Sequence, residues 1–255
     1  MCFLIFSYNN HNKYKLMFCA NRDEFFNRPT ENMHFWPENP DILAGRDLLG
    51  SGTWLGISRK GKIAALTNFR KLIDKPVEKL SRGRIVKYFL THNKNITNFF
   101  KYLKRTKDKY NFYNLIFGDI NELYYYSNKT DNIKLLESGI YGLSNAFLDT
   151  PWQKVVRGKE LFKDIISRDD FSYRDLFWLL TDNKKAEDDM LPDTGYPKVY
   201  ERELSSIFVQ MGEYGTRSST VILIDYSNNV DVYERCYDKE GYPISTKHFN
   251  FTIDF

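Results

Sequence analysis

The chain begins with Met1 and Cys2, followed by the short apolar run FLIF. A free cysteine packs like a small hydrophobic residue, so one interpretation places Cys2 at the start of a buried strand. The other interpretation is chemical. Removal of Met1 would leave a thiol and a free α-amine on one residue, which is a nucleophile that carries its own base.

Four short polar stretches follow apolar runs and contain side chains that could act together with a thiol. They place Arg22 and Asp23 in ANRDE, Asn68 in ALTNF, Asn145 in GLSN and Arg217 in YGTRS. Taken one at a time, such positions are more typical of turn caps, strand ends and ion pairs than of catalysis. Only their combination with a cysteine near the N-terminus favours a site.

Strands are expected at both ends of the chain and after its central helices. Apolar runs bounded by turn residues predict these strands. They cover residues 2–7, 14–20, 52–58, 63–69, 110–120, 122–128, 140–145 and 249–255, together with a hairpin at 219–237 that turns at 227–229. The first of these strands would bury Cys2.

Helices are expected in the middle of the chain, where apolar residues recur at helical spacing. They cover residues 76–92, 95–110, 150–166 and 172–182. Thr150 and Pro151 are a suitable N-cap and first helical residue for the third helix.

The proline-rich stretch at residues 27–41 is expected to be a loop. It carries His34, Phe35 and Trp36, and long loops are often functional. This aromatic segment is therefore either a lid over a site or a simple hydrophobic anchor.

Composition limits the class of protein. The chain has 255 residues, of which 42% are hydrophobic and 16% aromatic, so a single domain over residues 1–255 can bury a large core. The formal net charge of +4 is too small to indicate nucleic acid as the main partner. The basic stretch at 101–109 is interpreted as a solvated helix face.

The cysteines and the apolar runs bear on the cellular location. The three cysteines, Cys2, Cys19 and Cys236, are odd in number and widely spaced, which argues against a disulfide framework and a Cys-x-x-Cys metal site. Cys19 and Cys236 fall in strand patterns and are assigned to the core. The first apolar run is too short for a signal peptide, and no segment reaches transmembrane length. We expect a cytoplasmic protein without stable membrane insertion.

Several longer motifs resemble the NRDE family, whose eukaryotic members are called transport and Golgi organisation protein two homologues. The motifs are ANRDEFFNRPT, GSGTWLGIS, AALTNF, YGLSNAFLDTPWQK and YGTRSSTVILID. They occur in the family's order over essentially the whole chain. The chief departure is Ser51, where many relatives have another glycine, and it concerns only loop geometry.

This resemblance implies the fold of the N-terminal-nucleophile hydrolases, in the branch that contains bile-salt hydrolases and penicillin V acylase. The expected fold is α+β, a four-layer αββα sandwich of two antiparallel sheets. In that branch, the catalytic groups are a first-residue cysteine, an arginine and an aspartate on the next strand, two asparagines and a late arginine. The matching positions are Cys2, Arg22, Asp23, Asn68, Asn145 and Arg217. Arg22 and Asp23 are adjacent here, whereas the corresponding pair is spaced apart in the hydrolases.

The side-chain types at these positions suit attack of a thiol on an amide carbonyl. A guanidinium such as that of Arg22 favours the thiolate, which is the reactive form. The α-amine of Cys2 can carry the proton to the leaving amine, and Asp23 can hold that α-amine by a hydrogen bond.

The two asparagines and the late arginine complete the expected site. Asn68 and Asn145 are neutral donors that can stabilise the negative charge on the carbonyl oxygen. Arg217 can pair with Asp23 or bind a carboxylate of the ligand. No histidine is needed as the base.

Two functional classes follow from the resemblance. The first is an N-terminal cysteine hydrolase or acyltransferase that acts on an amide or acyl substrate with an apolar acyl group and needs no cofactor. The alternative is a non-catalytic carrier for haem or acyl lipids such as acyl-coenzyme A. Cys2, His34 or a tyrosine could then ligate haem. In both classes the partner is a small molecule with an apolar portion: an acyl-amide, acyl-coenzyme A or haem.

Overall fold

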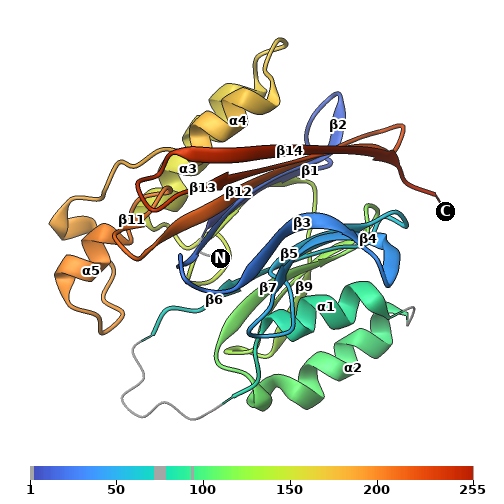
Figure 1. Cartoon of the computed structure of the whole chain (residues 1–255), viewed down its shortest axis with the longest axis horizontal. Coiled ribbons are helices and arrows are strands. Elements are labelled where there is room, and N and C mark those ends of the chain that lie inside the picture. The colour runs from blue at the N-terminus through green and yellow to red at the C-terminus, as the bar shows by residue number, and fades with distance from the viewer. Residues whose placement is uncertain (1–2, 72–78, 93–94, 255) are drawn as a thin grey trace. The chain divides into compact units, whose positions relative to one another are not determined.

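The computed structural model describes residues 3–71, 79–92 and 95–254 (Figure 1). Contacts within the chain divide it into two compact units. The first unit comprises Met1–Asn27, Arg70–Ile73 and Ser138–Asn250. The second unit comprises Arg28–Phe69, Asp74–Glu137 and Phe251–Phe255.

The first unit is built on an antiparallel sheet with the strand order β10-β1-β2-β12-β13-β14, and β11 also pairs with β12. The strands are β1 (Phe3–Tyr8), β2 (Tyr14–Phe25), β10 (Gly139–Leu143), β11 (Gln210–Met211), β12 (Tyr214–Asp225), β13 (Asn229–Tyr237) and β14 (Pro243–Thr252). Its helices are α3 (Gln153–Ile166), α4 (Tyr173–Leu180), the 3-10 turn η2 (Asp188–Met190) and α5 (Lys198–Glu203).

Helices α3 and α4 cover one face of this sheet. Successive side chains of a strand point to opposite faces. Every second residue of the central strands, such as Phe3, Ile5 and Cys19, therefore packs into one apolar core with residues of α3 and α4. Helix α4 begins with a capping box. The Ser172 side chain accepts from the backbone N–H of Asp175, and the Asp175 side chain accepts from the backbone N–H of Ser172.

The second unit has an antiparallel sheet with the order β3-β4-β5-β6-β7-β8-β9. The strands are β3 (Thr30–Trp36), β4 (Asn39–Asp47), β5 (Leu55–Ser58), β6 (Ile63–Asn68), β7 (Tyr113–Gly118), β8 (Leu123–Ser127) and β9 (Asn132–Leu135). The helices are α1 (Gly83–Thr91), α2 (Ile96–Thr106) and the 3-10 turn η1 (Lys107–Lys109).

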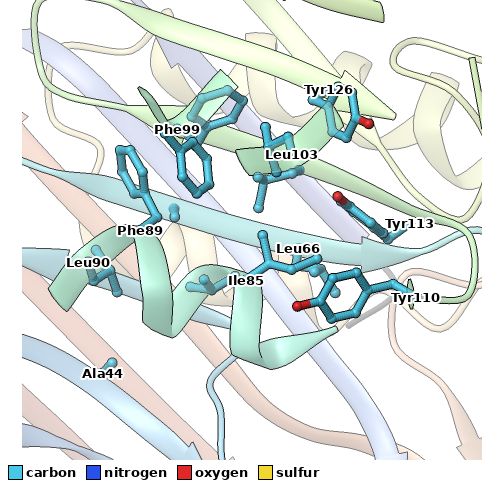
Figure 2. Close-up of a cluster of buried hydrophobic side chains, with 14 of the residues drawn as sticks. Ala44, Leu66, Ile85, Phe89, Leu90, Phe99, Leu103, Tyr110, Tyr113 and Tyr126 are labelled. Carbon is cyan, nitrogen blue, oxygen red and sulfur yellow. The ribbon is translucent and has the colours of Figure 1, made fainter. Parts of the chain in front are cut away.

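Helices α1 and α2 supply the core of the second unit together with the sheet. Their apolar faces meet the sheet in a cluster rich in aromatic rings. Figure 2 shows part of this cluster, including Ile85, Phe89, Phe99, Leu103, Tyr113 and Tyr126. Each unit thus contains its own apolar core.

The expectation of a loop at residues 27–41 is wrong, because most of this stretch forms β3 and the start of β4. Pro37 lies in the turn between these strands, and their pairing is irregular next to it, between Phe35 and Trp36. Proline is tolerated in edge strands and turns, where the missing N–H is not needed by the ladder. Trp36 is only 2% exposed and its Nε1 donates to the carbonyl oxygen of Ala44, so it is a core residue.

Most other predicted elements are confirmed, with shifts at their ends. The third helix begins two residues later than predicted, with Trp152 rather than Thr150 as its N-cap. Part of the predicted helix at 76–92 lies outside the described residues. Strand β9 and helix α5 are short elements that the sequence patterns did not indicate. Within the described parts of the chain, no helix is long and apolar enough to cross a membrane.

Candidate functional site

The candidate site of the first unit is centred on the N-terminal end of β1, where Phe3 is the first described residue. Phe3 is paired with Asn21 of β2, and Leu4 with Leu143 of β10. Neighbouring strands are about 4.8 Å apart, so β2 and β10 run about 10 Å from each other on the two sides of β1. The chain beyond these pairs supplies Arg22 on one side and Asn145 on the other. Cys2 itself lies outside the described residues.

Asn21, the first residue of the NRDE motif, has a structural role. Its Nδ2 donates to the carbonyl oxygens of Leu180 at 2.8 Å and Ile207 at 2.9 Å. Its Oδ1 accepts a hydrogen bond from Ser219 at 2.6 Å, and the side chain is fully buried. Asn21 therefore joins the end of α4 to the sheet.

Asp23 is a buried carboxylate, 2% exposed, with one oxygen in use. Oδ1 accepts from the Thr216 hydroxyl at 2.7 Å, and that hydroxyl oxygen accepts from the backbone N–H of Val209. Among the described residues, no group forms a hydrogen bond with the buried Oδ2 of Asp23. Because a buried carboxylate oxygen is costly to leave without a donor, this atom marks a place where a donor is expected.

A β-bulge brings Arg217 to the level of Arg22 and Asp23. Thr216 is paired with Asp23 and Ser218 with Arg22, so Arg217 is the extra residue between two pairs. Bulges often redirect a side chain next to a functional site. Arg22 is 5% exposed, while Arg217 is half-buried and donates from Nη1 to the carbonyl oxygen of Phe25 at 3.1 Å. Two arginines thus lie in neighbouring strands at this end of the sheet, where their positive charges favour anions.

Asn145 is 3% exposed and lies two residues beyond the end of β10. Its backbone oxygen accepts from the N–H of Arg70 at 2.7 Å. Its Oδ1 receives longer hydrogen bonds, at 3.4 Å, from the Arg70 guanidinium and the Ser144 hydroxyl. Arg70 in turn forms a buried ion pair with Glu201.

Arg70 and Glu201 were not identified from the sequence. Their ion pair joins residues 131 positions apart, and no local pattern marks either one. The only signal was the basic pair Arg70 and Lys71 directly after the strand predicted at residues 63–69.

Of the predicted site residues, the structure groups Arg22, Asp23, Asn145 and Arg217 in the first unit. Asn68 lies in the second unit, where it is the last residue of β6 and is paired with Tyr113 of β7. It is half-buried at that strand end.

The two described cysteines are core residues, as expected. Cys19 is fully buried, and desolvation holds the pKa of its thiol far above the ordinary value. Cys236 is 6% exposed, and burial raises the pKa of its thiol to about 12. A thiol that stays protonated is a poor nucleophile, so neither residue is a candidate for one.

The described residues contain no group of three or more His, Cys, Asp and Glu side chains that could hold a metal ion. The chemical groups at the end of β1 are instead guanidinium, carboxylate and amide. This set suits the binding and polarisation of a carbonyl compound.

Comparison with protein families and known proteins agrees with the motifs. A family model described as Transport and Golgi organisation 2 matches residues 1–239. The mouse Transport and Golgi organization 2 homolog is 34% identical over 275 residues, which cover 99% of both chains. The Drosophila melanogaster Transport and Golgi organization protein 2 is 29% identical and covers 92% of this chain and 91% of its own.

Two solved hydrolases have a similar fold. Penicillin V acylase from Agrobacterium tumefaciens matches with a TM-score of 0.53 and 10% identity, over 99% of this chain and 86% of its own. A mutant conjugated bile acid hydrolase from Clostridium perfringens matches with a TM-score of 0.52 and 10% identity, over 98% and 92%. The expected α+β fold with two antiparallel sheets is therefore confirmed.

Proposed function

Because the chain belongs to the Transport and Golgi organisation 2 family and shares its fold with amide-cleaving hydrolases, we propose that it is an N-terminal cysteine hydrolase or acyltransferase. Its substrate would be an amide or acyl compound with an apolar acyl group. The observation that supports this most directly is the grouping of Arg22, Asp23, Asn145 and Arg217 around the start of β1. Cys2 is the residue covalently joined to that start.

In this proposal, Met1 is removed and the Cys2 thiolate attacks the carbonyl carbon. The C–N or C–O bond of the substrate breaks, and the acyl group remains on sulfur as a thioester. The α-amine of Cys2 takes the thiol proton and passes it to the leaving group. Water or an acceptor amine then releases the acyl group.

The unfilled oxygen of Asp23 supports the role of the α-amine. A free N-terminal ammonium group carries three N–H donors, and the buried Oδ2 needs a donor. The neutral α-amine would donate to this oxygen and so stay beside the thiol, and the ammonium formed when it takes the thiol proton would be stabilised by the carboxylate. Arg22 and Arg217 would favour the thiolate by charge.

Asn145 would donate from its side-chain amide to the oxyanion that forms on the carbonyl oxygen. Loss of one such donor typically costs about 3 kcal/mol of transition-state stabilisation. The carboxylate of a substrate, if it has one, would bind Arg217.

The test begins with the intact mass of the purified protein and peptide mapping after brief iodoacetamide treatment. We expect loss of Met1 and faster labelling of Cys2 than of Cys19 or Cys236, whose raised thiol pKa values oppose ionisation. A p-nitrophenyl ester of a medium-chain fatty acid should then acylate Cys2 and release nitrophenol.

Cys2→Ala should abolish this release and the acyl mass increment, whereas Cys236→Ser, which removes a different thiol, should retain both. Met1 present on most molecules would contradict the proposal, because a peptide bond would replace the α-amine. Tight binding of haem or acyl-coenzyme A by both wild type and Cys2→Ala, without acylation of the wild type, would instead support the carrier.

A further inference from the structure

We propose that Arg70 is a positioning residue that orients the side-chain amide of Asn145, and that Glu201 holds Arg70 for this task. The inference rests on the proposed function, since it assigns Asn145 as an oxyanion donor. All three residues belong to the first unit.

The Arg70 guanidinium is fixed on several sides. Nη1 donates to Glu201 Oε2 at 2.6 Å, and the two side chains are only 7% and 2% exposed. Nη2 donates to the carbonyl oxygen of Leu204 at 3.3 Å. The guanidinium carbon lies 4.9 Å from the ring centre of Trp152, a favourable cation–π distance. A buried arginine with these partners has one accessible orientation.

Glu201 is held as firmly as Arg70. Glu201 is 1% exposed as a whole residue. Its second oxygen, Oε1, accepts a hydrogen bond from the hydroxyl of Thr194. Because both side chains of the ion pair are almost fully buried, protein groups rather than solvent keep it in place.

Arg70 contacts Asn145 twice. Its backbone N–H donates to the Asn145 backbone oxygen at 2.7 Å, which fixes the position of the residue. Its Nη2 reaches the side-chain Oδ1 at 3.4 Å, and the Ser144 hydroxyl reaches the same oxygen at the same distance.

These contacts determine which way the amide faces. The oxygen and nitrogen of an asparagine amide are nearly equal in size, so packing alone does not choose between its two orientations. A guanidinium only donates hydrogen bonds. The amide group that faces Arg70 must therefore be the oxygen, and Nδ2 must point to the other side. An oxyanion donor needs this orientation, because the reversed amide would present an oxygen to a negative charge.

The competing explanation is that the ion pair only stabilises the fold. Replacing both partners of a buried ion pair by apolar side chains of similar volume is often neutral for stability, whereas removing one partner is not. The double variant Arg70→Met, Glu201→Met therefore keeps the packing and removes the donor to Asn145.

The experiment measures nitrophenol release from the medium-chain ester by Arg70→Met, Arg70→Lys, the double variant and each combination with Asn145→Ala. We expect Arg70→Met and the double variant to lower kcat by about 10- to 100-fold with KM changed less than about threefold, because oxyanion stabilisation acts on the transition state. Arg70→Lys should retain part of the rate. In the Asn145→Ala background, Arg70→Met should cause no further loss, because the two residues act as one unit.

The matched control is Arg202→Met, which breaks the exposed ion pair of Arg202 and Asp188 next to Glu201 on the same segment. It should leave kcat unchanged. A wild-type kcat in the Arg70→Met, Glu201→Met variant would overturn the proposal. It would also be overturned if the fold-losses in kcat of Arg70→Met and Asn145→Ala multiplied when the two substitutions are combined. If single variants fail to fold, the double variant still decides the question.

A second readout keeps this proposal separate from the proposed function. In the absence of any substrate, NMR of the Asn145 side-chain NH₂ group should show shifted resonances and faster hydrogen exchange in the double variant than in wild type. Absence of acylation in the wild type would contradict the hydrolase, while unchanged Asn145 resonances in the double variant would contradict the role of Arg70.

Discussion

At the scale of residues, adjacent members of the NRDE motif have different roles, because successive side chains of a strand point to opposite faces of the sheet. Asn21 faces the helices and bonds the end of α4, whereas the next residue, Arg22, faces the opposite side of the sheet. Arg28, a few residues later, has a third task in the second unit. It forms a two-point ion pair with Asp47 at 2.8 and 3.0 Å, and Asp47 also accepts from the N–H of Gly50.

The structural role of Asn21 predicts a loss of stability without a direct loss of chemistry. Asn21→Ala leaves two buried carbonyl oxygens and the Ser219 hydroxyl without their partner. We expect the free energy of unfolding to fall by about 1–3 kcal/mol in urea titrations. Asn21→Asp, which keeps the size but cannot donate, should be at least as damaging, and the exposed Asn12→Ala should change stability by less than about 0.5 kcal/mol. Unchanged stability of Asn21→Ala would contradict this role.

At the scale of elements, helix α3 approaches the start of β1 closely because residue 158 is glycine. A Cβ at Gly158 would lie 2.6 Å from the Phe3 ring and 3.4 Å from Ile207. Phe3 is fully buried and follows Cys2 directly, so the helix spacing fixes the position of the first described residue of the strand.

Gly158→Ala therefore tests the contact between α3 and β1. Alanine is better than glycine in a helix by about 1 kcal/mol, yet overpacking a core typically costs about 1–3 kcal/mol. We expect net destabilisation in chemical unfolding and a slower acylation of Cys2. In the double variant with Phe3→Leu, which removes the ring, stability should partly return. A stabilised Gly158→Ala would show that α3 can move away without cost.

The turn between β1 and β2 contains a histidine whose neutral form the fold prefers. His11 Nδ1 accepts from the backbone N–H groups of Lys13 and Tyr14 at 3.1 and 3.2 Å. Burial lowers the pKa of His11 below its ordinary value, and Lys13 lowers it further, while a hydrogen bond with Ile166 and the charge of Asp169 oppose the shift. A protonated Nδ1 could not accept these two hydrogen bonds, because its own N–H would face the N–H groups of Lys13 and Tyr14.

This lowered pKa gives a pH dependence with a definite sign. The neutral histidine contributes its full stability above the ordinary value of 6.5, and the contribution is lost as the pH falls from 6.5 through the lowered pKa of the folded state. We expect the drop in Tm from pH 7.5 to pH 5.5 to be smaller in His11→Asn, whose side chain can accept the same bonds without titrating. Equal drops in wild type and variant would contradict this assignment.

At the scale of the whole molecule, each unit has its own apolar core, although neither is a continuous piece of chain. Segments before and after residue 69 enter both units, so the chain passes between them repeatedly. If residues 1–255 form a single domain, as predicted, the chain should unfold in one cooperative transition, which calorimetry can measure.

Paired core truncations test that prediction. Leu176 in α4 and Leu103 in α2 are fully buried in the first and second core. Leu176→Ala and Leu103→Ala should each lower the free energy of unfolding by about 2–5 kcal/mol. In a single cooperative domain, both variants shift one transition whose calorimetric and van't Hoff enthalpies agree. A transition that splits in Leu103→Ala would show two domains.

Local sequence determined much of this protein. Apolar alternation and turn residues predicted most of the strands, helical spacing predicted the helices, and the position of Cys19 in such a strand predicted its burial. These features depend on neighbours along the chain, which the sequence shows directly. The long motifs such as ANRDEFFNRPT and YGLSNAFLDTPWQK were enough to identify the family and its fold.

Tertiary structure alone decided the features that join distant segments. Strand β3 forms in a proline-rich stretch because it pairs with β4. The local propensity of the residues gives no indication of this pairing. The Thr216 hydroxyl reaches Asp23 across 193 positions and Arg70 reaches Glu201 across 131. The bulge at Arg217 exists only in the register of β12 against β2. Such partners depend on how the chain folds back on itself, so no local pattern predicts that Asp23 contacts Thr216 or that Arg70 contacts Glu201.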